Sequence, residues 1–173
     1  MKPILFLIPV IALTLTGILY YYFYKKNNNK KGYNKLVFTI ATFAFLFNLT
    51  WELIQIPLYK AGSYSIEHMA FCALASVADA ILVLLLFFGT AVLFRNLFWI
   101  QDKKWQQMVI VILLGATGAV LGEMRHLSIG SWAYADSMPI IPVVNVGITP
   151  VLQFMILPLL VYRISFRLYK KTH

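Results

Sequence analysis

Three carboxyl groups fall inside strongly apolar stretches of the sequence, where charged side chains are rare. They belong to Glu52, Asp79 and Glu123, three of the six acidic residues in the chain. A charged side chain at the centre of a bilayer costs about 2.5–3.5 kcal/mol on insertion scales, so such residues normally face other helices and mark functional sites. A desolvated carboxylic acid can act as a proton donor near neutral pH. These acids are therefore the candidate catalytic residues, together with His126, one helical turn after Glu123.

Helical spacing groups further polar and aromatic side chains with these acids. Asn48, Glu52 and Gln55 follow one another at i, i+4 and i+7, which places them within an arc of about 60° around a helix. In the next apolar stretch His68 and Asp79 are eleven residues apart, a spacing that returns to nearly the same helix face. The candidate substrate-binding residues are Asn48, Trp51, Gln55, His68, Trp132, Tyr134 and Gln153.

These groups come from four expected helices and fall in the same half of the membrane, which predicts one polar pocket that opens to the outside. A carboxylic acid between aromatic walls such as Trp51, Trp132 and Tyr134 would suit protonation of an alkene, because aromatic faces stabilise cations. The alternative is structural. Polar side chains also hold membrane bundles together, at about 0.6 kcal/mol for each hydrogen bond, and Trp and Tyr are typical of the interface.

A metal site is a second chemical interpretation of the same residues. Glu123-x-x-His126 has the one-turn spacing that binds one metal ion of a di-iron helix bundle. The sequence contains no second Glu-x-x-His, so a mononuclear site of mixed nitrogen and oxygen ligands is the remaining form. Its candidate ligands are Glu52, His68, Glu123 and His126. Whether a metal or another cofactor binds is left open by the sequence.

The composition is that of an integral membrane protein. The chain of 173 residues is 61% hydrophobic and 12% charged, whereas soluble domains are about a quarter charged. Its net charge of +9 does not indicate nucleic acid, because the lysines and arginines lie at the ends of apolar runs, as in the cytoplasmic loops of multi-pass proteins. We therefore expect membrane lipid as a partner and no nucleic acid. The single cysteine, Cys72, excludes an intramolecular disulfide, and the oligomeric state is not indicated.

Five apolar stretches are long enough to cross a bilayer core of about 30 Å. They run from about 3 to 22, 36 to 59, 69 to 94, 108 to 127 and 151 to 168. The basic connections Lys25–Lys35 and Arg95–Lys104 are expected in the cytoplasm with the C-terminus, and the N-terminus outside. The expected fold is an all-α bundle of five spans, a single domain over residues 1–173, in the bacterial inner (cytoplasmic) membrane.

The connection before the last span is unusually apolar. Met138 to Thr149 is too short to cross a membrane, and Pro139 and Pro142 disfavour a regular helix. We expect this segment to lie on the outer surface or to re-enter as a lid over the pocket, where protein must shield its backbone.

Two resemblances bear on function. The motifs WExxQxPLY (51–59), WAY followed by MP (132–139) and GxxPxxQ (147–153) resemble a family of small, uncharacterised bacterial multi-pass membrane proteins. The likeness covers about Phe47 to Pro158 and implies five spans but no particular activity; Ala78 stands where that family carries glycine before Asp79. A shorter likeness is to membrane carotenoid hydratases, in which a Glu precedes a Gly-x-x-x-aromatic-x-Tyr turn and a Pro-bearing apolar loop; here Glu123 precedes residues 130–139. That likeness implies an enzyme acting on an isoprenoid.

Three classes of function remain open on the sequence. The first is a membrane-embedded enzyme or binding protein for a lipid or isoprenoid, with acid–base roles for the buried acids. The second is a transporter of a small solute, protons or metal ions that uses the same residues as a relay. The third is an accessory subunit whose polar residues only hold the bundle or a partner. A polar path that continues past Asp79 would favour transport, whereas a blind site would favour the first class.

Overall fold

The computed structural model describes residues 7–102 and 104–172 and is all-helical. Within these ranges the helices are α1 (Leu7–Lys26), α2 (Lys30–Gln55), α3 (Ile66–Leu93), α4 (Trp105–Ser128) and α5 (Ile148–Thr172). Short 3₁₀ helices, η2 (Ile56–Leu58) and η3 (Trp99–Asp102), follow α2 and precede α4. The strands β1 (Ile140–Ile141) and β2 (Val146–Gly147) pair antiparallel between α4 and α5.

Four of the described helices are long and apolar enough to cross a membrane. These are α2 with η2 (Lys30–Leu58), α3, α4, and α5 as far as Lys170. A membrane protein built as an all-α bundle is therefore supported. The expected first span, from about 3 to 22, begins outside the described residues, and α1 covers its remainder. Five spans and their orientation stay predictions.

The helices extend beyond the apolar stretches that predicted them, because polar residues cap them. The second span was expected from about residue 36, but α2 begins at Lys30, where the side chain of Asn29 accepts a hydrogen bond from the amide of Gly32 at 2.9 Å. The expected connection Lys25–Lys35 is thereby reduced to residues 27–29. Ser65 caps α3 in the same way, through the amide of His68 at 3.3 Å.

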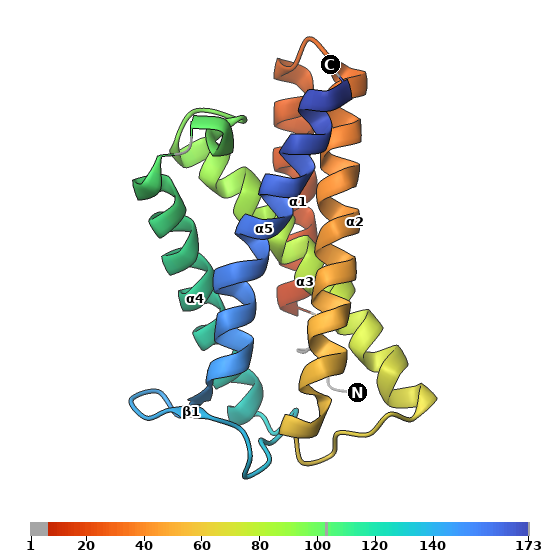
Figure 1. Cartoon of the computed structure of the whole chain (residues 1–173), viewed down its shortest axis with the longest axis vertical. Helices are drawn as coiled ribbons and strands as arrows, with labels where there is room; N and C mark the ends of the chain where they lie inside the picture. The colour runs from red at the N-terminus through yellow and green to blue at the C-terminus, as the bar shows by residue number, and fades with distance from the viewer. Residues whose placement is uncertain (1–6, 103, 173) are drawn as a thin grey trace.

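The helices alternate in direction, so the bundle has two distinct ends (Figure 1). α2, α3 and α5 pack against one another, α1 lies against α3, and α4 lies against α5. The α2–α3 connection, β1 and β2 lie at the lower end in Figure 1, and the α1–α2 connection and the C-terminus at the upper end. We call these the loop end and the basic end.

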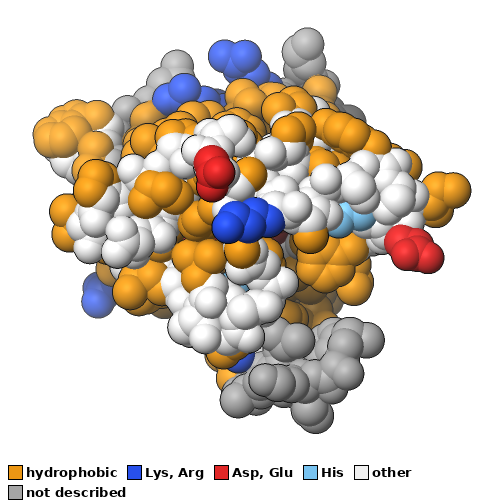
Figure 2. Space-filling view, turned by 90° about the horizontal axis from the view of Figure 1, so that it is seen from below, with side chains coloured by type: hydrophobic (Ala, Val, Ile, Leu, Met, Phe, Trp, Pro, Cys, Tyr) orange, Lys and Arg blue, Asp and Glu red, His pale blue; other side chains and the backbone are white. Residues whose placement is uncertain are grey.

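Charge separates the two ends. The basic end carries Lys25, Lys26, Lys30, Lys31, Lys35, Arg95, Lys104, Arg163, Arg167 and Lys170. The connections at the loop end, residues 59–65 and 129–147, contain only Lys60 and Asp136 as charged residues. Viewed from that end, the surface is mainly apolar or uncharged, with isolated charged side chains (Figure 2).

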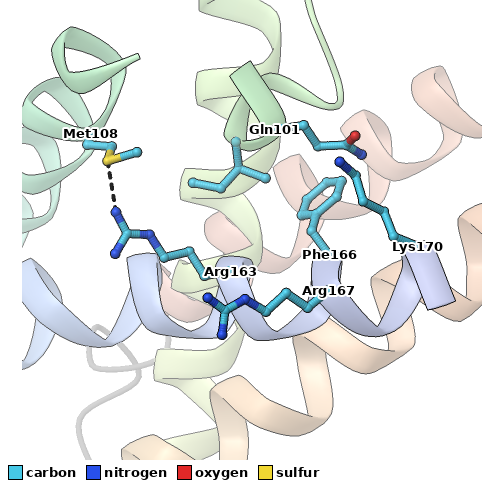
Figure 3. A pocket seen from close by; sticks show the side chains of 7 residues that line it. Gln101, Met108, Arg163, Phe166, Arg167 and Lys170 are labelled. Carbon is cyan, nitrogen blue, oxygen red and sulfur yellow. Dashed lines mark hydrogen bonds between the residues drawn. The ribbon is translucent and has the colours of Figure 1, made fainter. Parts of the chain in front are cut away.

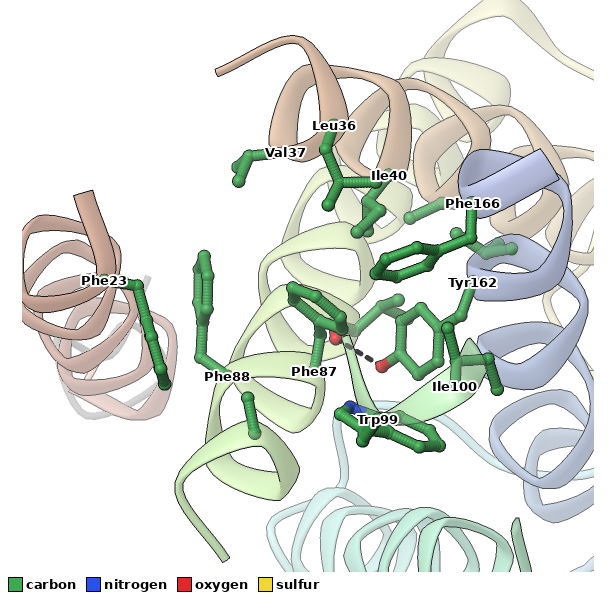
Figure 4. Close-up of a cluster of buried hydrophobic side chains, with 14 of the residues drawn as sticks. Phe23, Leu36, Val37, Ile40, Phe87, Phe88, Trp99, Ile100, Tyr162 and Phe166 are labelled. Carbon is green, nitrogen blue, oxygen red and sulfur yellow. Dashed lines mark hydrogen bonds between the residues drawn. The ribbon is translucent and has the colours of Figure 1, made fainter. Parts of the chain in front are cut away.

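Aromatic side chains fill the bundle on the side of the basic end (Figure 4). Phe87 of α3 contacts Phe88 and both Tyr162 and Phe166 of α5, with ring centroids 5.3–6.0 Å apart. Trp99 of η3 packs edge-on against Tyr162. The hydroxyl of Tyr162 donates to the carbonyl oxygen of Val83 at 2.7 Å, so the ring is buried with its polar group paired. We call these five aromatic residues the aromatic cluster.

The apolar connection before α5 forms a β-hairpin. Ile140 pairs with Gly147 and Ile141 with Val146, while Val143 at the tip is 91% exposed. Asn145 has a φ of 53°, the left-handed conformation that such a tight turn requires. Val146 of β2 and Met138, which precedes the hairpin, are both buried. The segment is thus a surface hairpin anchored on one side, as its prolines and length indicated, rather than a helix.

The contact between α4 and α5 leads to a stability prediction. A Cβ at Gly115 would lie 2.2 Å from the carbonyl oxygen of Phe154, whereas a Cβ at Gly118 meets nothing within 4 Å. Gly115→Ala should therefore lower the free energy of unfolding by about 1–3 kcal/mol, because the two helices must separate. Gly118→Ala is the matched control and should leave stability unchanged or slightly raised. Equal thermal unfolding of the two variants in detergent would contradict the close helix contact.

Candidate functional site

One side-chain amide joins three helices near the loop end. The Nε2 atom of Gln153 on α5 lies 2.8 Å from Oδ1 of Asn48, 3.3 Å from Oε1 of Glu52 and 3.2 Å from Oδ2 of Asp79. Asn48 and Gln153 are buried, and the Asn48 amide donates to the carbonyl oxygen of Ala44 at 2.7 Å. We call Asn48, Glu52, Asp79 and Gln153 the Gln153 cluster. It unites an acid and an amide of α2 with an acid of α3, as the helical spacing predicted.

The Gln153 cluster has more acceptors than donors. An amide nitrogen carries two hydrogens, yet three oxygen atoms lie within hydrogen-bond distance of it. Two ionised carboxylates so close together would repel each other in an environment without bulk water. The hydrogen bonds described for both acids come from an amide group, which is neutral. A proton on Glu52 or Asp79 would supply the missing donor and remove the repulsion.

Gln55 extends this cluster toward the loop end. It lies one turn after Glu52, is buried, and contributes a hydrogen bond to the Glu52 carboxyl. Its Oε1 atom is buried without a hydrogen-bond partner in the structure. An unpaired buried acceptor costs free energy, so this position also favours a neighbouring proton donor.

Glu123 forms a second cluster with the aromatic turn that follows α4. Its carboxyl is buried, and one oxygen, Oε2, accepts hydrogen bonds from the indole nitrogen of Trp132, at 3.1 Å, and from the Tyr134 hydroxyl. The His126 ring stacks on Trp132 with centroids 4.2 Å apart and an interplanar angle of 16°. We call Glu123, His126, Trp132 and Tyr134 the Glu123 cluster. Two donors on one oxygen orient the carboxyl and stabilise its negative charge.

Tyr59 packs against the Glu123 cluster, and the sequence did not identify it as a site residue. Its ring contacts Tyr134 and Trp132 at centroid distances of 5.6 and 6.3 Å. Burial raises the pKa of the Tyr59 phenol far above its ordinary value, and the carboxyls of Glu123 and Glu52 raise it further. The Tyr59 phenol therefore stays protonated at neutral pH. Its place directly after the Pro57-Leu58 pair was the only sequence signal.

Backbone hydrogen bonds hold the aromatic turn over the end of α2. The amide of Lys60 donates to the carbonyl oxygen of Ala133, and the amide of Ala135 donates to that of Leu58, both at 2.9 Å. Tyr59 and Tyr134 thereby face each other as an isolated antiparallel bridge. The turn is thus fixed relative to α2 as well as to α4, and the aromatic rings are held beside the acids.

Two predicted site residues have no described contact with these clusters. His68 is partly buried in the first turn of α3, and the ring contact described for it is with Phe71, at 6.4 Å. Trp51 directly precedes Glu52 in the sequence and is partly buried. No contact described for it joins its ring to the acids of either cluster. Their roles in binding stay predictions.

The predicted metal ligands are not gathered. In residues 7–102 and 104–172 no group of three or more His, Cys, Asp and Glu side chains could hold a metal ion. In this arrangement Glu123 accepts hydrogen bonds from the aromatic turn and His126 stacks on Trp132. A metal site formed by Glu52, His68, Glu123 and His126 stays a prediction.

The polar region ends abruptly toward the basic end. Val83, one turn beyond Asp79 on α3, is fully buried, and Phe87 and Tyr162 of the aromatic cluster follow it. The hydroxyl of Tyr162 is already paired with the Val83 carbonyl. Packed aromatic and aliphatic side chains thus close the acidic region on the side away from the loops.

Comparison of the chain with protein-family models, curated proteins and solved structures finds no match. The two resemblances drawn from sequence motifs therefore stay predictions, and the functional argument rests on the geometry of the two clusters.

The hydrogen bond from Tyr134 to Glu123 should make a pH-dependent contribution to stability. Burial, and then this hydrogen bond, raise the pKa of the Tyr134 phenol above its ordinary value. Tyr134→Phe should lower the free energy of unfolding by about 1 kcal/mol at neutral pH. The folded-state pKa is raised, so this contribution is complete below the unfolded value of about 10 and is lost as the pH rises beyond it.

Denaturant unfolding of the wild type and Tyr134→Phe at several pH values measures this difference. Tyr64→Phe is the control, because that phenol is exposed and its hydrogen bond to Leu53 is long, at 3.3 Å. The Tyr134 difference should be constant below about pH 9 and shrink above pH 10. A difference that is absent, or that grows with pH, would contradict the donor role of Tyr134.

Proposed function

We propose that this membrane protein binds a lipid-soluble molecule of the isoprenoid class at its loop end and acts on it by acid–base chemistry at Glu123. The observation that carries the proposal is the Glu123 carboxyl, which is buried and held through one oxygen by Trp132 and Tyr134. These donors belong to a surface turn and not to another helix. Their main effect is therefore to orient the acid beside aromatic rings, which helix association does not require.

The chemistry follows from those neighbours. A protonated Glu123 donates its proton to one carbon of an alkene, and the π electrons form the new C–H bond. The carbocation at the other carbon is stabilised by the faces of Tyr59 and Trp132, and the carboxylate by the two hydrogen-bond donors. Return of a proton from a neighbouring carbon to Glu123 completes an isomerisation without a co-reactant.

Transport is the weaker alternative because the acidic region is closed toward the basic end. The aromatic cluster and Val83 follow Asp79 directly, with buried side chains on both α3 and α5. A proton or solute relay needs polar groups or water along its whole path. A site that is blind on this side and bordered by aromatic rings is the arrangement expected for a binding protein or enzyme of a lipid-soluble substrate.

Lipid extraction from purified protein tests this function. Wild type, Glu123→Gln and the control Glu67→Gln, an exposed acid in the first turn of α3, are purified in parallel and their lipids measured by mass spectrometry. Wild type and Glu67→Gln should retain the same apolar lipid. Glu123→Gln preserves the side-chain volume but cannot donate the proton, so the product-to-substrate ratio should fall by at least about 100-fold.

The proposal is wrong if no apolar lipid is enriched over the host membrane and the three lipid profiles agree. Circular dichroism of each protein establishes that the helices are retained. A changed lipid profile in Glu67→Gln as well would indicate a general effect of lost charge and would equally count against a role for Glu123.

We further propose that the basic end faces the cytoplasm of a bacterium and the loop end the outside of its inner membrane. The support is the charge asymmetry of the two ends. In intact cells a membrane-impermeant thiol reagent should label Ser137→Cys, at the loop end, and not Asn28→Cys, between α1 and α2. Both positions are exposed, and Cys72 is buried. The reverse labelling pattern would invert the orientation and remove the outward-facing site.

A further inference from the structure

A basic cleft lies at the opposite end of the bundle from the acids (Figure 3). It is an open cavity of about 410 Å³ between the last turns of α5, the start of α4, and η3. Arg163, Arg167 and Lys170 of α5 supply its charge, and Ile100, Met108 and Phe166 its apolar lining. We call it the basic cleft. Its size is within the range of ligand sites, about 300–1,000 Å³.

The three cations share one face of α5. Their spacing of i, i+4 and i+7 places them within an arc of about 60° around the helix. Like charges so close together on one helix face disfavour one another. A cluster of this kind is stabilised by an anion that bridges it.

No carboxylate of the described residues neutralises this face. Asp102 of η3 is the acid at this end, and its Oδ2 accepts a hydrogen bond from the amide of Asn96 at 3.1 Å. Arg163 contacts the sulfur of Met108 at 3.1 Å, a weak acceptor that orients the guanidinium without cancelling its charge (Figure 3). The cleft therefore presents charge that is available to a ligand.

The lining selects the kind of anion. Two guanidinium groups and an ammonium match the oxygen atoms of a phosphate group, which arginine binds through two parallel hydrogen bonds. Ile100 and Phe166 are buried and form an apolar floor, which a free phosphate ion does not use. The cleft lies at the ends of helices that are apolar enough to cross a membrane, at the level where arginine side chains reach lipid headgroups.

From these observations we propose that the basic cleft binds the phosphate of an anionic phospholipid headgroup, with Arg163 and Arg167 as the principal ligands and Lys170 beside them. The apolar floor accommodates the glycerol and the first acyl carbons. Basic pockets between membrane helices are suited to such headgroups. This site is independent of the chemistry proposed at Glu123, and its failure would leave that proposal unaffected.

Native mass spectrometry of the purified full chain tests the site by titration with phosphatidylglycerol, phosphatidylcholine or inorganic phosphate at fixed salt. The wild type should bind phosphatidylglycerol at least about tenfold more tightly than the other two. Arg163→Gln with Arg167→Gln should weaken phosphatidylglycerol binding by about tenfold or more. The matched control is Lys31→Gln with Lys35→Gln, which removes the same charge at the same spacing and the same end of the bundle.

Three results would overturn the proposal: no preference for phosphatidylglycerol, equal loss of binding in the lysine control, or equally tight binding of inorganic phosphate. The first two indicate diffuse surface charge, and the third a site for a soluble anion. Lys170→Gln leaves the Arg163–Met108 contact intact and provides the test if the double arginine variant does not fold. It should weaken phosphatidylglycerol binding by about fivefold; unchanged binding would again overturn the proposal.

Discussion

The loop end of the bundle depends on one constraint. Three oxygen acceptors meet at the single amide nitrogen of Gln153. Asn48, Glu52 and Asp79 come from α2 and α3, and their shared donor comes from α5. Isolated carboxylates at this position would be strongly disfavoured. The amide reduces that cost and also fixes the three helices in one register, because a shift of a single residue on α5 would leave all three oxygens without their donor.

The Gln153 cluster has fewer donor hydrogens than acceptor oxygens, and this imbalance affects more than helix packing. The acids of the Gln153 cluster have amide partners rather than cations, and Glu123 has an indole and a phenol. Neutral donors stabilise a carboxylate less than a cation does. Most lysines and arginines of the described residues lie instead at the basic end, and the aromatic cluster lies between that end and the acids. The two proposed sites, one for acid–base chemistry and one for an anionic headgroup, are thus at opposite ends of the bundle.

Much of the fold and part of the site were predictable from the sequence, for physical reasons that also explain the failures. Apolar runs predict helices, and the 3.6-residue period correctly placed Asn48, Glu52 and Asp79 on faces that meet. The start of the second span was placed several residues too late, because capping by Asn29 depends on one local hydrogen bond. Tyr59 was missed because its position follows from the pairing of two connections, which has no periodicity to detect.

The surroundings of Glu123 could not be predicted from helical spacing. Sequence spacing places Glu123 and His126 on one helix face, but it does not determine what lies opposite that face. In the fold the aromatic turn lies there, so that Trp132 donates to Glu123 through its indole edge and stacks on His126 through its face. One indole thus contacts both side chains. Because the backbone bonds of Lys60 and Ala135 hold this turn, Glu123 is positioned by the connection between α2 and α3 as much as by its own helix.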